Sequence, residues 1–149
     1  IIVTATGIEL NSLNDINVSI DNVKINAHER LIYKGMMLSG VPNFALSFGY
    51  VNASWTLRAD LTCEYVCRLI NLMDKKGFTC CAPIDDPSAY GNDDLIDFTS
   101  GYVQRGLHLM PKQGNKAPWK NYQNYIKDIF AVRLFSIKDS NLNFYNQKK

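Results

Sequence analysis

The sequence predicts an α+β fold, in which short strands and hairpins precede one long helix and a helical C-terminal part. Three observations support this prediction. Residues 1–49 contain short β-branched or alternating runs broken by Gly, Pro and Asn, whereas residues 56–73 repeat apolar side chains at intervals of three and four. Residues 82–97 are rich in Pro, Asp, Gly and Asn, which is typical of a loop.

The chain opens on an apolar, β-branched run at residues 1–5 that breaks at Thr6 and Gly7. This pattern predicts a buried strand that ends at a tight turn. Because a buried strand needs neighbours, we expect the chain to be the C-terminal part of a larger protein.

The next segment predicts further strands. Alternating runs at 16–20 and 23–25 flank an Asp-Asn pair at 21–22, which is a hairpin signal. Two more strands are expected over 33–38 and 44–49, separated by a turn that contains Pro and Asn.

The periodic segment 56–73 predicts the main helix of the chain. Ser54 or Thr56 can cap its first N–H groups, and residues 75–77, Lys-Lys-Gly, suit its C-terminus. We therefore expect a long amphipathic helix with well-marked ends.

The loop at 82–97 is the expected boundary between a core portion, 1–81, and a helical C-terminal extension, 98–149. Within the extension, one helix is predicted from Thr99 or Ser100 to Met110, stopped by Pro111.

A second helix of the extension is predicted from Pro118 to about Arg133, because proline suits a first helical turn. A terminal strand is expected at residues 142–145.

Composition excludes some classes of protein. The 149 residues are 46% hydrophobic and 20% charged, which is ordinary for a globular domain, and the net charge of +2 is too small to indicate nucleic acid or an anionic membrane as partner. No run is long and apolar enough for a membrane span. We expect a cytoplasmic protein.

The four cysteines form two close pairs, Cys63 with Cys67 and Cys80 with Cys81. Neither pair supplies the four ligands of a structural zinc site, and adjacent cysteines form a disulfide only under strain. We expect buried, reduced thiols and no metal.

Two segments are candidate binding sites. Residues 49–57 lead from a strand directly into the main helix. The unpaired backbone N–H groups at the positive end of the helix dipole can bind an anionic or electron-rich group. The alternative is that this segment is a plain packing turn. Residues 111–120 contain three lysines and Trp119. The lysines can clamp a phosphate and the Trp can stack on a base. The alternative is a solvated basic loop with Trp119 in the core.

His28 and His108 do not have the spacing of a catalytic triad, so the catalytic residues stay unknown.

Several motifs in order resemble the C-terminal part of flavin-containing monooxygenases, and more narrowly the bacterial FAD-dependent or Baeyer-Villiger-like branch. The motifs are the Ala5, Thr6, Gly7 ending of the first run and the segments 33–44, 50–57, 101–105, 111–114, 118–119 and 123–125. The Gly-x-Gly-x-x-Gly fingerprint of that family's dinucleotide-binding domains is not in this sequence.

The resemblance implies a fragment of an α/β flavoprotein with two dinucleotide-binding domains. In such enzymes NADPH reduces FAD, the reduced flavin captures O2 as a C4a peroxide, and one oxygen passes to a ketone, sulfide or amine. The resemblance also implies that the helix start, with backbone donors around Thr56 and Leu57, faces the flavin N1/C2 edge. Asn52, Ser54 and Trp55 would line that edge or the substrate pocket, and Ala5, Thr6 and Gly7 would mark a hinge between domains.

Without the remaining part of such an enzyme, we expect the chain to be inactive, to hold FAD weakly, and to form a homodimer through exposed apolar surface. The rival hypothesis is a stand-alone module that binds an anion or a protein through the loop from Lys112 to Lys120.

Overall fold

The computed structural model describes residues 1–7, 10, 12–13, 16–91 and 93–146. This part of the chain mixes short antiparallel ladders with helices, which confirms the α+β class. Its strands are β1 (Val18–Ile20), β2 (Val23–Ile25), β3 (Ile32–Tyr33), β4 (Met37–Leu38), β5 (Cys80–Pro83) and β6 (Leu142–Tyr145). Its helices are α1 (Trp55–Lys76), α2 (Gly101–Gly106) and α3 (Tyr125–Arg133), with single 3-10 turns at Ala27–Glu29, Pro87–Ala89 and Leu107–Leu109.

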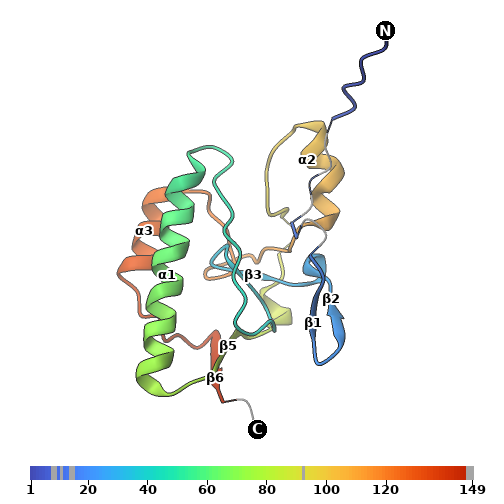
Figure 1. Cartoon of the computed structure of the whole chain (residues 1–149). Helices are drawn as coiled ribbons and strands as arrows, with labels where there is room; N and C mark the ends of the chain where they lie inside the picture. Colours follow the sequence, from blue (N-terminus) through green and yellow to red (C-terminus); the bar gives the residue numbers. More distant parts are fainter. Residues whose placement is uncertain (8–9, 11, 14–15, 92, 147–149) are drawn as a thin grey trace.

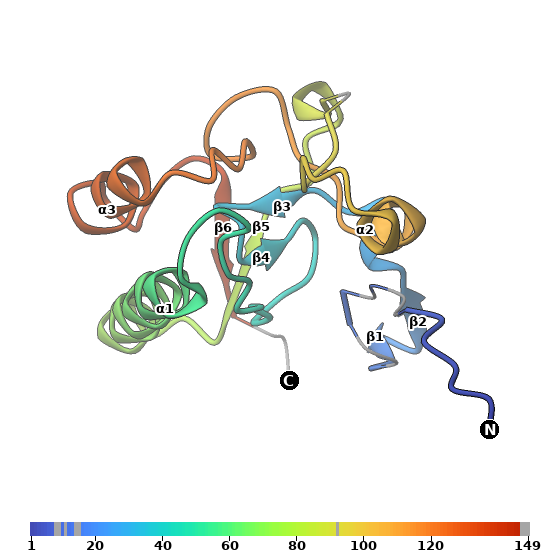
Figure 2. The same ribbon diagram turned by 90° about the horizontal axis from the view of Figure 1, so that it is seen from above.

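The β3–β4 and β5–β6 ladders occupy the centre of the molecule (Figures 1 and 2). α1 and α3 lie side by side on one flank, whereas α2 and the β1–β2 hairpin lie on the other (Figures 1 and 2). The main apolar cluster fills the space between α1, α3 and the central strands. No helix in the described ranges is both long and apolar enough to cross a membrane.

The long helix is confirmed, and its sequence explains its buried face and its C-terminal end. Leu61, Tyr65 and Leu69 repeat at intervals of four and are buried against the core. Gly77 takes the left-handed conformation at φ 71° and donates its N–H to the last-turn carbonyls, which is the usual glycine C-cap.

The hairpin predicted at residues 16–25 is confirmed as β1 and β2. Asp21 and Asn22 have φ of 49° and 66°, as a tight two-residue hairpin turn requires.

The prediction of one strand at 33–38 and a second at 44–49 is wrong. The chain turns within the first segment, because Lys34 and Gly35 both have positive φ and bring Met37 opposite Tyr33. One segment therefore forms the β3–β4 hairpin, and residues 44–49 form no strand.

The strand predicted at residues 1–5 is also wrong. These residues are extended but unpaired and fully exposed, and none of the described strands lies against them. A β-branched run becomes a strand only where a neighbouring backbone completes its hydrogen bonds.

The helix predicted from Thr99 or Ser100 to Met110 is confirmed as α2, with Ser100 at its N-cap position, and the following 3-10 turn, which end before Pro111. The helix predicted from Pro118 is wrong over its first turns, since α3 begins only at Tyr125 after the Asn124 cap. The backbone at 118–119 is bonded elsewhere: Pro118 O accepts from Lys34 N at 2.8 Å and Trp119 O from Gly114 N at 2.9 Å. These tertiary bonds displace the helix.

The terminal strand at 142–145 is confirmed as β6, which pairs with β5. β5 includes Ala82 and Pro83, so the start of the predicted loop 82–97 is strand instead, and residue 92 of that loop lies outside the described residues.

The β5–β6 ladder and the α1–α3 contact join the predicted portions 1–81 and 98–149. The division into two portions stays a prediction.

All four cysteines are free. Cys80 and Cys81 are buried as expected, but Cys63 and Cys67 are exposed on α1, so the expectation of burial is wrong for that pair. The described residues contain no cluster of side chains that could hold a metal ion.

Candidate functional site

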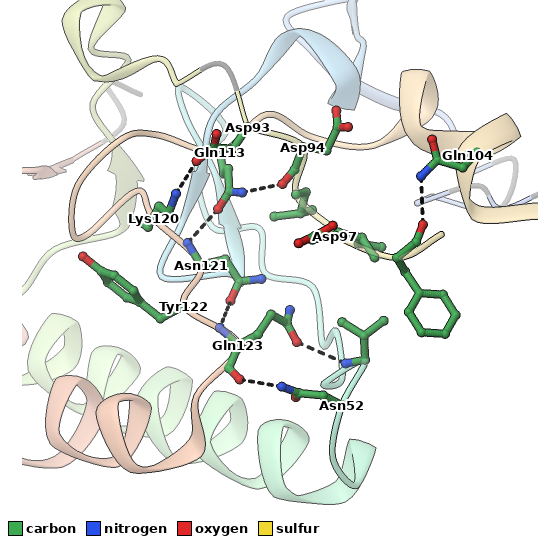
Figure 3. Close-up of a pocket in the computed structure, with 14 residues that line it drawn as sticks. Asn52, Asp93, Asp94, Asp97, Gln104, Gln113, Lys120, Asn121, Tyr122 and Gln123 are labelled. Carbon is green, nitrogen blue, oxygen red and sulfur yellow. Dashed lines mark hydrogen bonds and ion pairs between the residues drawn. The ribbon is translucent and has the colours of Figure 1, made fainter. Parts of the chain in front are cut away.

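An open cavity of about 830 Å³ lies beside the start of α1 (Figure 3). Three segments form most of its walls: the approach to α1, the chain before α2, and the chain before α3. Gln104 of α2 completes them. Its lining residues are Val51, Asn52, Asp93, Asp94, Leu95, Ile96, Asp97, Phe98, Gln104, Gln113, Lys120, Asn121, Tyr122 and Gln123. The volume falls in the roughly 300–1,000 Å³ range of small-molecule sites.

Gln123 holds the approach to α1 in place. Its side-chain oxygen accepts a bond from the Val51 N–H at 3.1 Å, and its backbone oxygen accepts one from the Asn52 side-chain amide at 3.3 Å (Figure 3). Gln123 has a φ of 49°, an uncommon conformation for a residue other than glycine, so the surrounding contacts must stabilise it. Asn52 is thereby fixed at the edge of the cavity.

Gln113 joins the other two walls. It is buried, its side-chain amide donates to the Asp94 carbonyl, and its side-chain oxygen accepts from the Asn121 N–H at 3.0 Å (Figure 3). Sequence analysis missed both glutamines as individual site residues, because each acts through loops that are distant in sequence.

The wall before α2 is acidic. Asp93, Asp94 and Asp97 all line the cavity, and Lys120 forms an ion pair with Asp93. The cavity therefore presents carboxylates and amides on one side and Val51 and Asn52, which precede α1, on the other.

The first turn of α1 has no capping side chain. Ser54 occupies the N-cap position, but its hydroxyl lies 2.7 Å from the Thr56 hydroxyl and caps no backbone N–H. No acidic residue lies in this turn. The N–H groups at the positive end of the helix dipole are therefore not neutralised by side chains.

Gly49 is needed where the chain approaches α1. A Cβ atom at this position would lie 2.2 Å from the Trp55 ring, which is exposed and packs against Phe48 with ring centroids 5.5 Å apart. Only glycine fits beneath this indole.

The structure brings only part of the predicted site together. Asn52 lines the cavity, whereas Ser54, Trp55 and Thr56 are exposed at the start of α1 and Leu57 is half-buried in its first turn.

The N-terminal segment that contains Ala5, Thr6 and Gly7 lies apart from the start of α1 (Figures 1 and 2). The three residues are exposed, and a Cβ at Gly7 would lie 3.3 Å from the Arg105 guanidinium of α2. They do not line the cavity, and their role stays a prediction.

The lysine loop at 111–120 has no exposed aromatic platform. Trp119 is 1% exposed and packs edge-on against Tyr33, while Lys112 lies over the Tyr90 ring and Lys120 is paired with Asp93. A buried indole cannot stack on a ligand, so Trp119 lies in the core as the alternative prediction states, and anion binding by the three lysines stays a prediction.

Comparison with known proteins shows to which proteins this chain is related. The chain is 45% identical, over 144 residues, to the FAD-containing monooxygenase EthA of Mycobacterium tuberculosis, a match that covers 97% of this chain and 29% of the relative. Its homologues are FAD-containing monooxygenases. The probable FAD-binding monooxygenase AlmA of an Acinetobacter species is 42% identical over 99% of this chain and 30% of its own length. EthA of Mycolicibacterium smegmatis is 40% identical over 97% of this chain and 29% of its own length.

These matches confirm the resemblance inferred from the sequence, and the named relatives are enzymes. The chain spans about 29% of the length of the EthA relatives it matches. No family model and no solved structure matches it.

Proposed function

We propose that this chain serves in a flavoprotein monooxygenase with two dinucleotide-binding domains that uses FAD, NADPH and O2. One oxygen atom of O2 is added to an organic substrate, a ketone, sulfide or amine. The other leaves as water, with the two electrons supplied by NADPH and one further proton from solvent. The observation that carries this proposal is the 45% identity to an FAD-containing monooxygenase over 97% of the chain.

The structure supports a place for the flavin beside α1. The first-turn N–H groups around Thr56 and Leu57 lack a side-chain cap and suit the electron-rich N1/C2 edge of an isoalloxazine. Bound FAD supplies the redox chemistry, which no side chain can perform. The helix terminus would stabilise negative charge on that edge by roughly 0.3–2 kcal/mol.

The remaining predicted residues would act around this edge. Asn52, held by Gln123, would orient the flavin edge or the substrate from within the cavity. Ser54 and Trp55 would lie along the same edge. Ala5, Thr6 and Gly7 would form the hinge between the two dinucleotide-binding domains.

We expect the chain alone to be inactive and to hold FAD weakly. The sequence contains no Gly-x-Gly-x-x-Gly motif, so contacts to the adenosine and pyrophosphate must come from elsewhere in such an enzyme. The four free thiols suit a reducing compartment, and we propose the cytoplasm.

The test is expression of the chain within its complete reading frame. We expect a yellow protein with the visible absorbance of oxidised flavin and NADPH-dependent O2 uptake that rises with a ketone, sulfide or amine. A colourless protein that takes up no FAD when reconstituted contradicts the proposal.

The Asn52→Leu variant tests the site more closely. In the full-length flavoprotein we expect slower substrate oxygenation or more uncoupled O2 consumption, because the amide at the cavity edge is lost. Stopped-flow absorbance and product yield per NADPH measure both effects. Asn17→Leu, at an exposed position before β1, is the matched control. Unchanged flavin kinetics and unchanged yield in Asn52→Leu refute this role.

A further inference from the structure

A second pocket, of about 480 Å³, lies between α3 and the chain before it. It shares Lys120 and Tyr122 with the cavity beside α1, but apolar groups dominate its walls. Pro118, Ala131 and Phe135 are among these apolar groups. Nothing in the proposed flavin chemistry uses this pocket.

The Lys34 ammonium enters this pocket without a carboxylate partner. Among the described residues, it donates one hydrogen bond, to the Ala131 carbonyl at 3.4 Å, and no carboxylate lies within 4.0 Å of it. It also lies 5.6 Å from the centroids of the Tyr33 and Tyr65 rings. The other cations near it are engaged: Arg58 pairs with Asp128 and Lys120 with Asp93. Asp128 and Asp139 also line the pocket, but Asp128 is bonded to Tyr50 and Arg58 and Asp139 to Tyr33. A partly buried ammonium without an ion pair is costly.

The electrostatics at Lys34 agree with this geometry. Burial lowers the pKa of Lys34, nearby Asp139 opposes this effect, and the positive charge of Arg58 adds to it. An anion placed against the amine would therefore raise the pKa of Lys34 again.

The backbone holds Lys34 in an uncommon conformation. Its φ is 49°, which favours glycine or asparagine, and its N–H and C=O are both fixed, by the Pro118 carbonyl and the Arg58 guanidinium. The side chain is thus directed into the pocket at a cost in backbone strain.

We propose that this pocket binds a small carboxylic acid with an apolar body. The carboxylate accepts hydrogen bonds from the Lys34 ammonium, with Lys127 as a second cation on the pocket wall, and the apolar body lies against Ala131 and Phe135. The volume is within the roughly 300–1,000 Å³ range of small-molecule sites. The proposal does not depend on the flavin.

The test is calorimetric titration of the chain with octanoate and, separately, with 1-octanol, which has the same chain length and no charge. We expect octanoate to bind and 1-octanol to bind at least about tenfold more weakly, since a charge-assisted hydrogen bond contributes about 1.5–3 kcal/mol. Lys34→Asn, which keeps a residue tolerated at positive φ, is expected to lose this preference. Lys24→Gln, at an exposed position of β2, is the control and is expected to bind as the wild type does.

A second variant keeps the proposal testable if Lys34→Asn is poorly folded. Ala131→Phe fills the pocket without altering the amine and is expected to abolish octanoate binding while the far-ultraviolet circular dichroism is kept. The proposal is overturned if octanoate fails to bind the wild type, if 1-octanol binds equally well, or if octanoate binds a folded Ala131→Phe variant with wild-type affinity.

Discussion

At the scale of single residues, a buried ion pair supports the approach to α1. Arg58 on α1 and Asp128 on α3 form this pair, and the Tyr50 hydroxyl donates to the same Asp128 carboxylate at 2.6 Å. The side chains of Arg58 and Asp128 are 6% and 12% exposed, so neither charge can exchange its partner for water. Arg58, Asp128 and Tyr50 therefore connect α1 and α3 to the segment before α1, which lines the cavity.

Arg58→Ala should therefore be strongly destabilising. Removing the guanidinium leaves the Asp128 charge buried and unpaired, which typically costs about 3–5 kcal/mol of unfolding free energy. Urea unfolding measures the loss. Arg133→Ala breaks the more exposed pair with Glu64 and should cost about 1 kcal/mol or less. Equal losses in the two variants would show that burial of the Arg58 pair has no energetic consequence.

At the scale of elements, α1 is the part of the fold that local signals determine best. Its buried face repeats every three to four residues, and Gly77 ends it in the left-handed conformation. Its start is left without a side-chain cap, where a more stable helix would have one. This difference between the two ends is consistent with a ligand at the first turn.

Gly77→Ala isolates the conformational contribution of this cap. A Cβ there meets no atom within 4 Å, so the expected loss of about 1 kcal/mol arises from the positive φ alone. Thermal unfolding measures it. Gly101→Ala, at the start of α2 where φ is not positive, should be neutral or slightly stabilising. A neutral Gly77→Ala would contradict this explanation of the helix end.

At the scale of the whole molecule, buried cysteine and tyrosine side chains make the unfolding free energy depend on pH. Burial raises the pKa of Cys81 from 9.0 to about 11 and that of Tyr50 from 10.0 to about 12, and it also raises the pKa of Tyr33 and Tyr65. All of these groups hold their protons more tightly when the chain is folded.

The unfolding free energy should therefore fall as the pH rises above about 9, the unfolded value for cysteine. Above that pH the unfolded chain releases protons that the folded chain retains, so alkali favours unfolding. Urea unfolding across this range measures the slope. Tyr50→Phe should reduce the slope above pH 10, because one of the shifted groups is removed. A free energy that stays constant through this range would refute the coupling.

The outer face of α3 carries an apolar stripe. Ile126, Phe130 and Leu134 recur every four residues and are all more than half exposed. We expect the chain to self-associate through this stripe, as the homodimer prediction requires. Sedimentation velocity should show Leu134→Lys shifted toward monomer and Ser19→Lys, on exposed β1, unchanged. Equal association of both variants would place the contact elsewhere.

The sequence by itself determined the elements whose signals lie within a few residues. These are the long helix, the Asp21–Asn22 hairpin, α2 before Pro111, and the relationship to FAD-containing monooxygenases. Such signals act through neighbouring side chains and turn conformations, so they are visible in a short stretch of chain.

Tertiary structure alone decided the rest. It left residues 1–5 unpaired, paired β5 with β6, and kept 118–124 out of a helix because Trp119 and its backbone are bound in the core. It also brought Gln113 and Gln123 to the cavity. The physical reason is that backbone hydrogen bonds and buried side chains need partners, and those partners lie far away in the sequence.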